Sequence, residues 1–204
     1  LLCNEQRDPS SEELKLLKAD RTSVDIALFG RMLASSPEFN VEAACQVAHS
    51  ISVHKVLVED DYFTAVDDLN DGKTDAGSAH IGEANFAAAL FYSYICINKS
   101  QLVENLGGNE ALADNAIKAL TEAAVKVSPK GKQNSFASRA YASYVMAEMG
   151  EQQPRSLSVS YLKPVQDEDM AEAAITAIEK QAVNFDAVYG KCADARYTIN
   201  AVKG

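Results

Sequence analysis

Two stretches of the chain repeat apolar residues at the spacing of one helix face. In residues 110–127 these positions recur every three or four residues after Asn109, which suits the place just before a helix. Residues 167–188 repeat the pattern over a longer stretch. We therefore predict two long amphipathic helices, with these residues facing the core: Leu112, Ala116, Leu120, Ala123 and Val127 in the first, and Ala171, Ala174, Ile175, Ile178, Ala182 and Phe185 in the second.

Around these helices the apolar pattern indicates strands. Residues 86–98 carry apolar side chains on both alternating faces, which is typical of a central strand covered on both sides. Residues 140–147, 156–162 and 197–202 indicate three further strands. The resulting order is strand, helix, strand, strand, helix, strand. This is the split βαβ pattern of a ferredoxin-like or RNA-recognition-motif-like fold, so we predict the α+β class.

The first 85 residues change their pattern more often. A capping pattern predicts a short helix over residues 10–19, and a β-branched and aromatic run predicts a strand over 23–32. Asn40 precedes helical spacing over 41–50. We predict next a β-hairpin whose two strands are residues 51–58 and 62–66, on either side of an acidic turn. A loop over residues 69–78 follows.

Composition sets limits on this picture. The hydrophobic fraction of 47% in 204 residues is enough for a core in one large domain or two small ones. No apolar run reaches the roughly 18 residues that a membrane span needs, and no signal peptide is visible at the start. Because the chain begins with Leu, we expect a piece of a longer protein. The net charge of −10 argues against nucleic acid as a partner, although a local basic groove can exist on an acidic protein.

The cysteines and histidines do not favour a metal site. The four cysteines are scattered and none forms a CxxC pair, so we expect unpaired thiols in a reducing cytoplasm and no cofactor. Only three histidines are present. These positions are Cys3, Cys45, Cys96, Cys192, His49, His54 and His80.

Five sequence blocks carry a family resemblance. They are VDIALFGRM (24–32), HKVLVEDDYFTAVDDL (54–69), GSAHIG (77–82), FYSYICIN (91–98) and QLVENLGG (101–108). In order and spacing they resemble the backbone subunit of the type I-E CRISPR surveillance complex, the CasC family of Cascade. The resemblance implies a subunit that polymerises along a guide RNA and displaces its bases at intervals.

The resemblance also implies a division of the chain. Residues 1–50 would hold the end of a helical finger subdomain and a strand leading into the palm. Residues 51–82 would form a thumb β-hairpin with its loop, and residues 83–204 a ferredoxin-like palm. The family's N-terminal strand and a Lys/Arg-rich segment that grips phosphates are absent, so we expect weak RNA affinity for this piece alone. The loop over 70–76 is longer than expected for the family.

Carried over by position, the resemblance assigns RNA-binding residues. Met32 and Phe63 would wedge on either side of the displaced nucleotide, and Thr64 follows Phe63 in the thumb. A thioether and a flat ring suit this role because they fill the gap of an unstacked base without reading its hydrogen bonds. Arg31 suits a phosphate contact, and Gly30 beside it allows close approach.

Each assignment has a plainer alternative. Phe63 suits core or hairpin packing, and Met32 suits core filling. His54 and His80 suit RNA contact or hydrogen bonds within a hairpin. The basic loop SPKGKQNSF suits a guide-backbone contact or a solvated turn, through Lys130, Lys132 and Gln133.

The expected function is therefore a structural, non-enzymatic subunit of a cytoplasmic ribonucleoprotein. Its expected partners are the guide crRNA, copies of itself, other Cascade subunits and target DNA through the guide, with no membrane. One rival is a metal-dependent ribonuclease that uses Asp67 or Asp68, and another is an acidic protein-interaction module.

Overall fold

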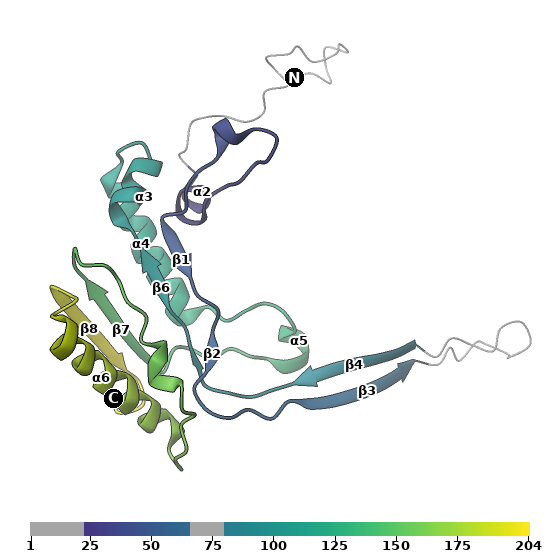
Figure 1. Ribbon diagram of the computed structural model, residues 1–204. Coiled ribbons are helices and arrows are strands. Elements are labelled where there is room, and N and C mark those ends of the chain that lie inside the picture. Colours follow the sequence, from purple (N-terminus) through teal and green to yellow (C-terminus); the bar gives the residue numbers. More distant parts are fainter. Residues whose placement is uncertain (1–22, 66–79) are drawn as a thin grey trace, which may run out of the picture. The chain divides into compact units, whose positions relative to one another are not determined.

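The computed structural model describes residues 23–65 and 80–204. It confirms the α+β class, with helices beside small antiparallel strand pairs (Figure 1). The described helices are α2 (Val24–Phe29), α3 (Lys99–Asn105), α4 (Glu110–Lys126), α5 (Gln133–Phe136) and α6 (Met170–Tyr189), with 3-10 turns η1 (Pro37–Phe39) and η2 (Ser158–Tyr161). The described strands are β1 (Cys45–Val47), β2 (Ile51–Ser52), β3 (Glu59–Ala65), β4 (His80–Phe86), β5 (Phe91–Tyr92), β6 (Ile95–Ile97), β7 (Tyr144–Met149) and β8 (Ala195–Asn200).

The strands pair two by two within the described residues. β1 pairs with β6, β2 with β5, and β7 with β8. The longest ribbon joins β3 and β4 in antiparallel register, from Glu59 opposite Phe86 to Ala65 opposite His80. Figure 1 shows this ribbon as two long arrows. It is the element on which the resemblance places Phe63 and Thr64.

The chain divides into two compact units. Unit 1 comprises Leu1–His49, Tyr94–Met146 and Tyr197–Ala201, and unit 2 comprises Ser50–Ser93, Ala147–Arg196 and Val202–Gly204. The strand pair β7–β8 contributes residues to both units. Each unit has its own buried residues.

Unit 1 has an apolar core between α2, β1, α3 and α4. Its buried members are Ala27, Leu28, Ala44, Cys45, Leu102, Leu106, Ala113 and Ala116. Asn105 is buried beside them at 2% exposure, although its side chain is polar. Its Nδ2 donates to the carbonyl oxygens of Ala27 at 2.9 Å and Glu42 at 2.8 Å, so one side chain ties α3 to α2 and to the chain before β1.

Unit 2 packs α6 against η2. The Tyr161 hydroxyl donates to Ala174 O at 3.0 Å, and the Tyr161 ring lies 5.6 Å from that of Tyr92, centroid to centroid. Burial, and then the neighbouring Tyr92, raise the pKa of Tyr161 to about 12. The phenol is therefore held neutral as part of the packing.

A second feature of unit 2 is a half-buried cluster of two arginines and two carboxylates. Arg155 binds Glu148 at 2.9 Å and Asp186 at 2.8 Å. Arg196 binds the same two carboxylates, with Nε 2.8 Å from Glu148. Burial raises the pKa of Asp186, but hydrogen bonds from Arg196 and the Cys192 amide outweigh it, so that pKa lies below its usual range. The cluster fixes α6 to the strand ends.

The long helices confirm the sequence prediction, with one correction: Val127, predicted to face the core, follows the end of α4 and is 65% exposed. α4 begins after Asn109, whose side chain accepts from Leu112 N at 3.0 Å, as a capping asparagine should. α6 begins after Asp169, which accepts from Glu172 N at 2.9 Å. The strands predicted over 140–147 and 197–202 are found, shifted by a few residues, as β7 and β8.

Two predictions before residue 50 were wrong. The run over 23–32 is not a strand, because Val24–Phe29 form α2, with Ser23 as its N-cap and Gly30 as its C-cap. The stretch over 41–50 is not a helix. The side chain of Asn40 accepts from Leu33 N at 2.6 Å instead of capping a helix, and Cys45 then enters β1, opposite Ile97.

The predicted hairpin, the single strand over 86–98 and the strand over 156–162 also need correction. β3 pairs with β4, not with residues 51–58. The region 86–98 breaks into β5 and β6, which pair with different partners. Within residues 156–162, Ser158–Tyr161 form η2, and Leu157 N donates to the Tyr92 hydroxyl rather than to a strand neighbour. The helix predicted over 10–19 and the loop over 70–76 lie outside the described residues.

Two further observations bear on site chemistry. Among the described helices, none combines the length and apolar character that a membrane crossing requires. The three described cysteines are free thiols, as predicted, while Cys3 lies outside the described residues. Burial, and then the neighbouring Cys96, raise the pKa of Cys45, so this thiol is held in its neutral form.

Candidate functional site

The turn after α2 contains Gly30 and Arg31. Gly30 has φ +78° and ψ 173°, a conformation that side chains with a Cβ essentially do not adopt. A Cβ there would also meet Val41 O at 2.8 Å. The close approach that Gly30 allows is thus to the chain itself, where Arg31 and Val41 form an isolated β-bridge.

Arg31 is half-buried but retains its charge. Its Nε and Nη2 both donate to Phe39 O, at 3.0 and 2.8 Å. A carbonyl oxygen orients the guanidinium without neutralising it. Arg31 is therefore a fixed cation beside an exposed turn.

Met32 lies at the surface of this turn. Its side chain is 87% exposed, so the alternative that Met32 fills the core is wrong. A flexible thioether in this position is free to pack against another molecule.

Phe63 lies on the β3–β4 ribbon directly opposite Gly82. A Cβ built on Gly82 would overlap the Phe63 ring, so the ring lies across the glycine. This arrangement, an aromatic side chain covering a cross-strand glycine, packs the inner face of the ring. The ring is nevertheless 47% exposed, which leaves surface for stacking.

The remaining ribbon positions are placed by their backbones. Thr64 pairs with Ile81, and His80 begins β4 opposite Ala65. Asp60 accepts from Asn85 Nδ2 at 3.1 Å across the ribbon. Asp67 and Asp68, on which the ribonuclease alternative depends, lie outside the described residues.

His54 uses both ring nitrogens within the chain. Leu90 N donates to Nε2 at 3.1 Å, so Nδ1 carries the proton and donates to Lys55 O at 2.9 Å. The ring thereby connects the chain after β2 to the chain before β5. An RNA contact by His54 stays a prediction.

Lys132 and Gln133 lie where the basic loop enters the short helix α5. Lys132 has φ +57° and Ala137 has φ +50°, both in the left-handed region that non-glycine residues rarely adopt. The Gln133 amide donates to the carbonyl oxygens of Pro129 and Ser138 and so holds the loop closed.

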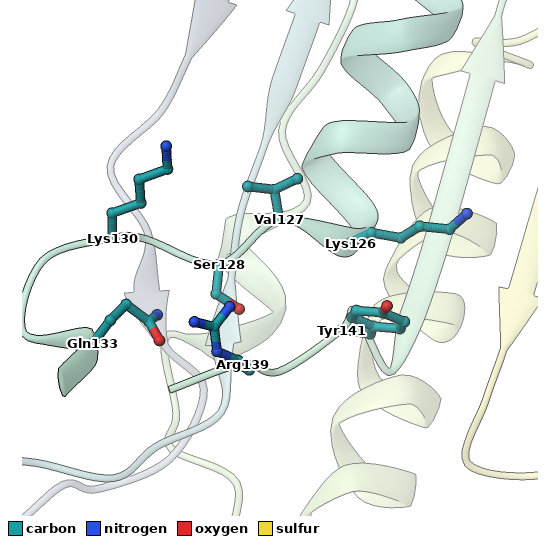
Figure 2. Close-up of a pocket in the computed structure, with 7 residues that line it drawn as sticks. All are labelled: Lys126, Val127, Ser128, Lys130, Gln133, Arg139 and Tyr141. Carbon is teal, nitrogen blue, oxygen red and sulfur yellow. The ribbon is translucent and has the colours of Figure 1, made fainter. Parts of the chain in front are cut away.

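A cavity of about 710 Å³ opens beside this loop at the end of α4. Figure 2 shows the residues that line it, with Lys130 and Gln133 on one side of the view, Lys126 and Tyr141 on the other, and Ser128 and Arg139 between them. Val127 completes the lining, and Lys132 is not part of it. The lining contains three cationic side chains and no carboxylate.

The structure groups the predicted residues by unit. Gly30, Arg31 and Met32 belong to unit 1, as do Lys132 and Gln133, while His54, Phe63, Thr64 and His80 belong to unit 2. Sequence reasoning missed Gly82 as the partner of Phe63, and it missed Arg139 and Tyr141 beside Gln133. The sequence does contain a signal for Arg139 and Tyr141, because residues 126–147 include no Asp or Glu.

The site offers no ready set of metal ligands in the part of the chain that the structure describes. No three His, Cys, Asp or Glu side chains gather there as a cation site would require. What the described residues do offer is an exposed thioether, a half-exposed ring and unpaired cations. These are the side chains that contact single-stranded nucleic acid without reading its sequence.

The chain matches the family described as CT1975-like protein over residues 3–203. It belongs to this family. Two solved structures are similar to it. A chain of a structure described as "CRISPR RNA-guided surveillance complex, pre-nicking" has 32% identity and a TM-score of 0.75, over 94% of this chain and 50% of that one. A chain of a "CRISPR RNA-guided surveillance complex" has 31% identity and a TM-score of 0.71, over 86% of this chain and 66% of that one. No curated protein matches the chain.

The CT1975-like chain thus spans between half and two thirds of the length of these solved relatives. The similarity confirms the predicted kinship with subunits of CRISPR surveillance complexes at this broader level. The narrower assignment to the type I-E CasC family stays a prediction.

Proposed function

We propose that the chain is part of a guide-RNA-binding subunit of a CRISPR RNA-guided surveillance complex. The observation that carries this proposal is the 32% identity over 94% of the chain with a subunit of such a complex. The exposed Met32 and the half-exposed Phe63 ring support it, because both offer apolar surface outside the core.

In its more specific form, the proposal concerns the type I-E backbone. Copies of the subunit polymerise along the guide crRNA in the cytoplasm, beside other Cascade subunits, and target DNA binds through the guide. Met32 and Phe63 from neighbouring copies wedge beside each displaced base, with Arg31 and Thr64 next to them. The described residues that would contact RNA act by shape and charge, so any guide sequence is accepted. The subunit is not an enzyme in this proposal.

The first test changes the two wedge residues in the complex that contains this chain. Phe63→Ala with Met32→Ala is expected to abolish the regular positions at which guide bases become reactive to chemical probes, while the complex still assembles. Each residue contributes about 1–3 kcal/mol of stacking or packing. Tyr62→Ala is the matched control, because Tyr62 is 70% exposed on the same strand but alternates to its other face.

Unchanged reactive positions in the double variant would refute the wedge. Absence of any guide RNA from the purified complex would refute the broader proposal as well. Cleavage of target RNA in Mg²⁺ or Mn²⁺, abolished by Asp68→Ala, would favour the ribonuclease instead.

A further inference from the structure

Gly82 is an unusual residue for its place in the β3–β4 ribbon. It lies inside β4, directly opposite Phe63. A glycine inside a strand weakens the strand, because its backbone loses more freedom on folding than that of any other residue and it brings no side chain to the packing. The presence of glycine at this position therefore calls for a reason.

The backbone of Gly82 does not supply that reason. Five other glycines in the described part of the chain have a positive φ, but Gly82 does not. A β-bulge would also favour glycine, yet the pairing continues without an extra residue on either side, from Tyr62 opposite Glu83 to Thr64 opposite Ile81. An alanine could adopt this strand conformation without strain.

The reason lies in the Phe63 ring. A Cβ built on Gly82 would overlap Phe63 Cζ and would lie 2.7 Å from both Cε1 and Cε2. The outer end of the ring thus rests symmetrically on the glycine and leaves no room for a methyl group. Because this is the far end of a side chain with two rotatable bonds, an added methyl group would turn the ring aside rather than break the strand pairing.

The two faces of the ribbon differ in the bulk of their side chains. On the face that carries Phe63, Gly82 is followed two residues later by Ala84, so β4 presents little side-chain volume there. On the other face Tyr62 stands opposite Glu83, and both of these larger side chains are exposed. β4 thus forms a shallow seat on one face, and the Phe63 ring occupies it.

This seat leaves one side of the ring available. The ring packs against Gly82 and is still 47% exposed. A group that already holds its binding orientation loses less freedom when it binds. A flat ring held in this way can stack on any base, because every base has a π-face.

We propose that Gly82 is a positioning residue for Phe63. By lacking a side chain, it lets the ring lie against β4 and so fixes the direction in which the ring meets a displaced guide base. Gly82 itself does not contact the RNA. The inference rests on the proposed function of Phe63 and adds a requirement to it: position 82 accepts only glycine while position 63 carries an aromatic ring.

The first measurement tests the placement of the ring without RNA. An aromatic ring shifts the NMR signals of protons above its face upfield. In the 204-residue chain the Hα signals of Gly82 are therefore expected upfield of those of Gly131, whose Cβ position has no neighbour within 4 Å. Phe63→Leu should remove this difference. Gly82 signals that Phe63→Leu leaves unchanged would overturn the inference.

The second measurement tests the consequence in the complex that contains this chain. Gly82→Ala is expected to reduce the regular positions of guide-base reactivity as much as Phe63→Ala does, while Tm of the isolated chain stays within about 3 °C. The two changes together should reduce them no further, because both act through the same ring. Gly131→Ala is the matched control, since it adds the same methyl group in open space and without a positive φ.

The possible outcomes separate this inference from the proposed function. If Phe63→Ala removes the regular reactive positions but Gly82→Ala leaves them intact, the wedge stands and the positioning role of Gly82 is refuted. A double variant that loses more than Phe63→Ala alone would refute it too, as would a large fall in Tm for Gly82→Ala, which would show that the glycine serves the backbone. If Phe63→Ala leaves the reactive positions unchanged, the wedge fails and the role of Gly82 fails with it.

Discussion

Gly30 shows how a single residue determines the geometry of the candidate site. It ends α2 and directs the chain so that Arg31 pairs with Val41 while Met32 remains outside. Its dihedral angles lie in a region that is essentially restricted to glycine. The exposure of Met32 therefore depends on the absence of a side chain two residues earlier.

We expect Gly30→Ala to destabilise the protein by at least about 2 kcal/mol, because strain adds to the clash with Val41 O. Urea unfolding followed by circular dichroism measures this change. Gly131→Ala is the control, since a Cβ at Gly131 has no neighbour within 4 Å and the residue does not have a positive φ. Equal stability of the two variants would show that the turn tolerates a side chain.

At the scale of elements, the α6–η2 contact depends on the protonation state of Tyr161. Its phenol donates to Ala174 O and has a pKa of about 12. Below pH 10 the folded and unfolded states both keep the proton, so this group adds no pH dependence. Between pH 10 and 12 the unfolded chain loses the proton first, which favours unfolding, so stability falls as pH rises.

Tyr161→Phe is expected to lower stability at neutral pH by about 1 kcal/mol, through the lost hydrogen bond. It should also make the decline between pH 10 and 12 shallower than in the unaltered chain. Thermal unfolding across this pH range measures both effects. Tyr197→Phe, at a ring that is 64% exposed, is the control for loss of a surface hydroxyl, and an equal change in slope for both variants would contradict the assignment to Tyr161.

The sequence predicted the elements whose signals are local. α4 and α6 each follow a capping side chain and repeat apolar residues along one face, so nearby residues suffice to identify them. The residues of β1 were assigned to a helix because their strand partner, which includes Ile97, lies about fifty residues further along the sequence. The side chain of Asn40 also bonds to Leu33 rather than to a following helix. Propensity over a short window does not contain that information.

The candidate site was also predictable only where its signals are local in the sequence. The resemblance placed Phe63 on a ribbon, but the facing residue depends on register across residues 66–79, and a local pattern does not fix register over such a connection. Gly82 therefore went unassigned. Arg139 went unassigned for a different reason: it is separated from Lys130 by nine positions, and only the fold around α5 brings both to one cavity.

At the scale of the whole molecule, the described residues fall into two units, and each unit has buried residues of its own. Unit 1 is held by the cluster around Leu102 and Asn105, and unit 2 by α6 with η2 and the arginine–carboxylate cluster. Separate cores allow each unit to open without the other. The division also places Met32 and Phe63 in different units.

Asn105→Ala is expected to cost about 2–4 kcal/mol, because the buried carbonyl oxygen of Ala27 and the partly buried one of Glu42 lose their donor. Hydrogen exchange read by mass spectrometry should show faster exchange in α2, α3 and α4, with little change in α6. Asn115→Ala, at an exposed position of α4, is the control. Uniformly faster exchange throughout the described residues would instead show that the two units open together.

The β3–β4 ribbon has a consequence for the handling of this protein in solution. Within the described residues each of its strands pairs only with the other, so both outer edges carry backbone groups open to strand addition. Glu59, Asp60, Asp61 and Glu83 line these strands as exposed carboxylates. Their charge keeps ribbons of different molecules apart, as edge charges do in natural sheets. At the sequence pI of about 4.8 the whole chain carries no net charge, so the repulsion between molecules is weakest there, and we expect association to begin at the ribbon edges.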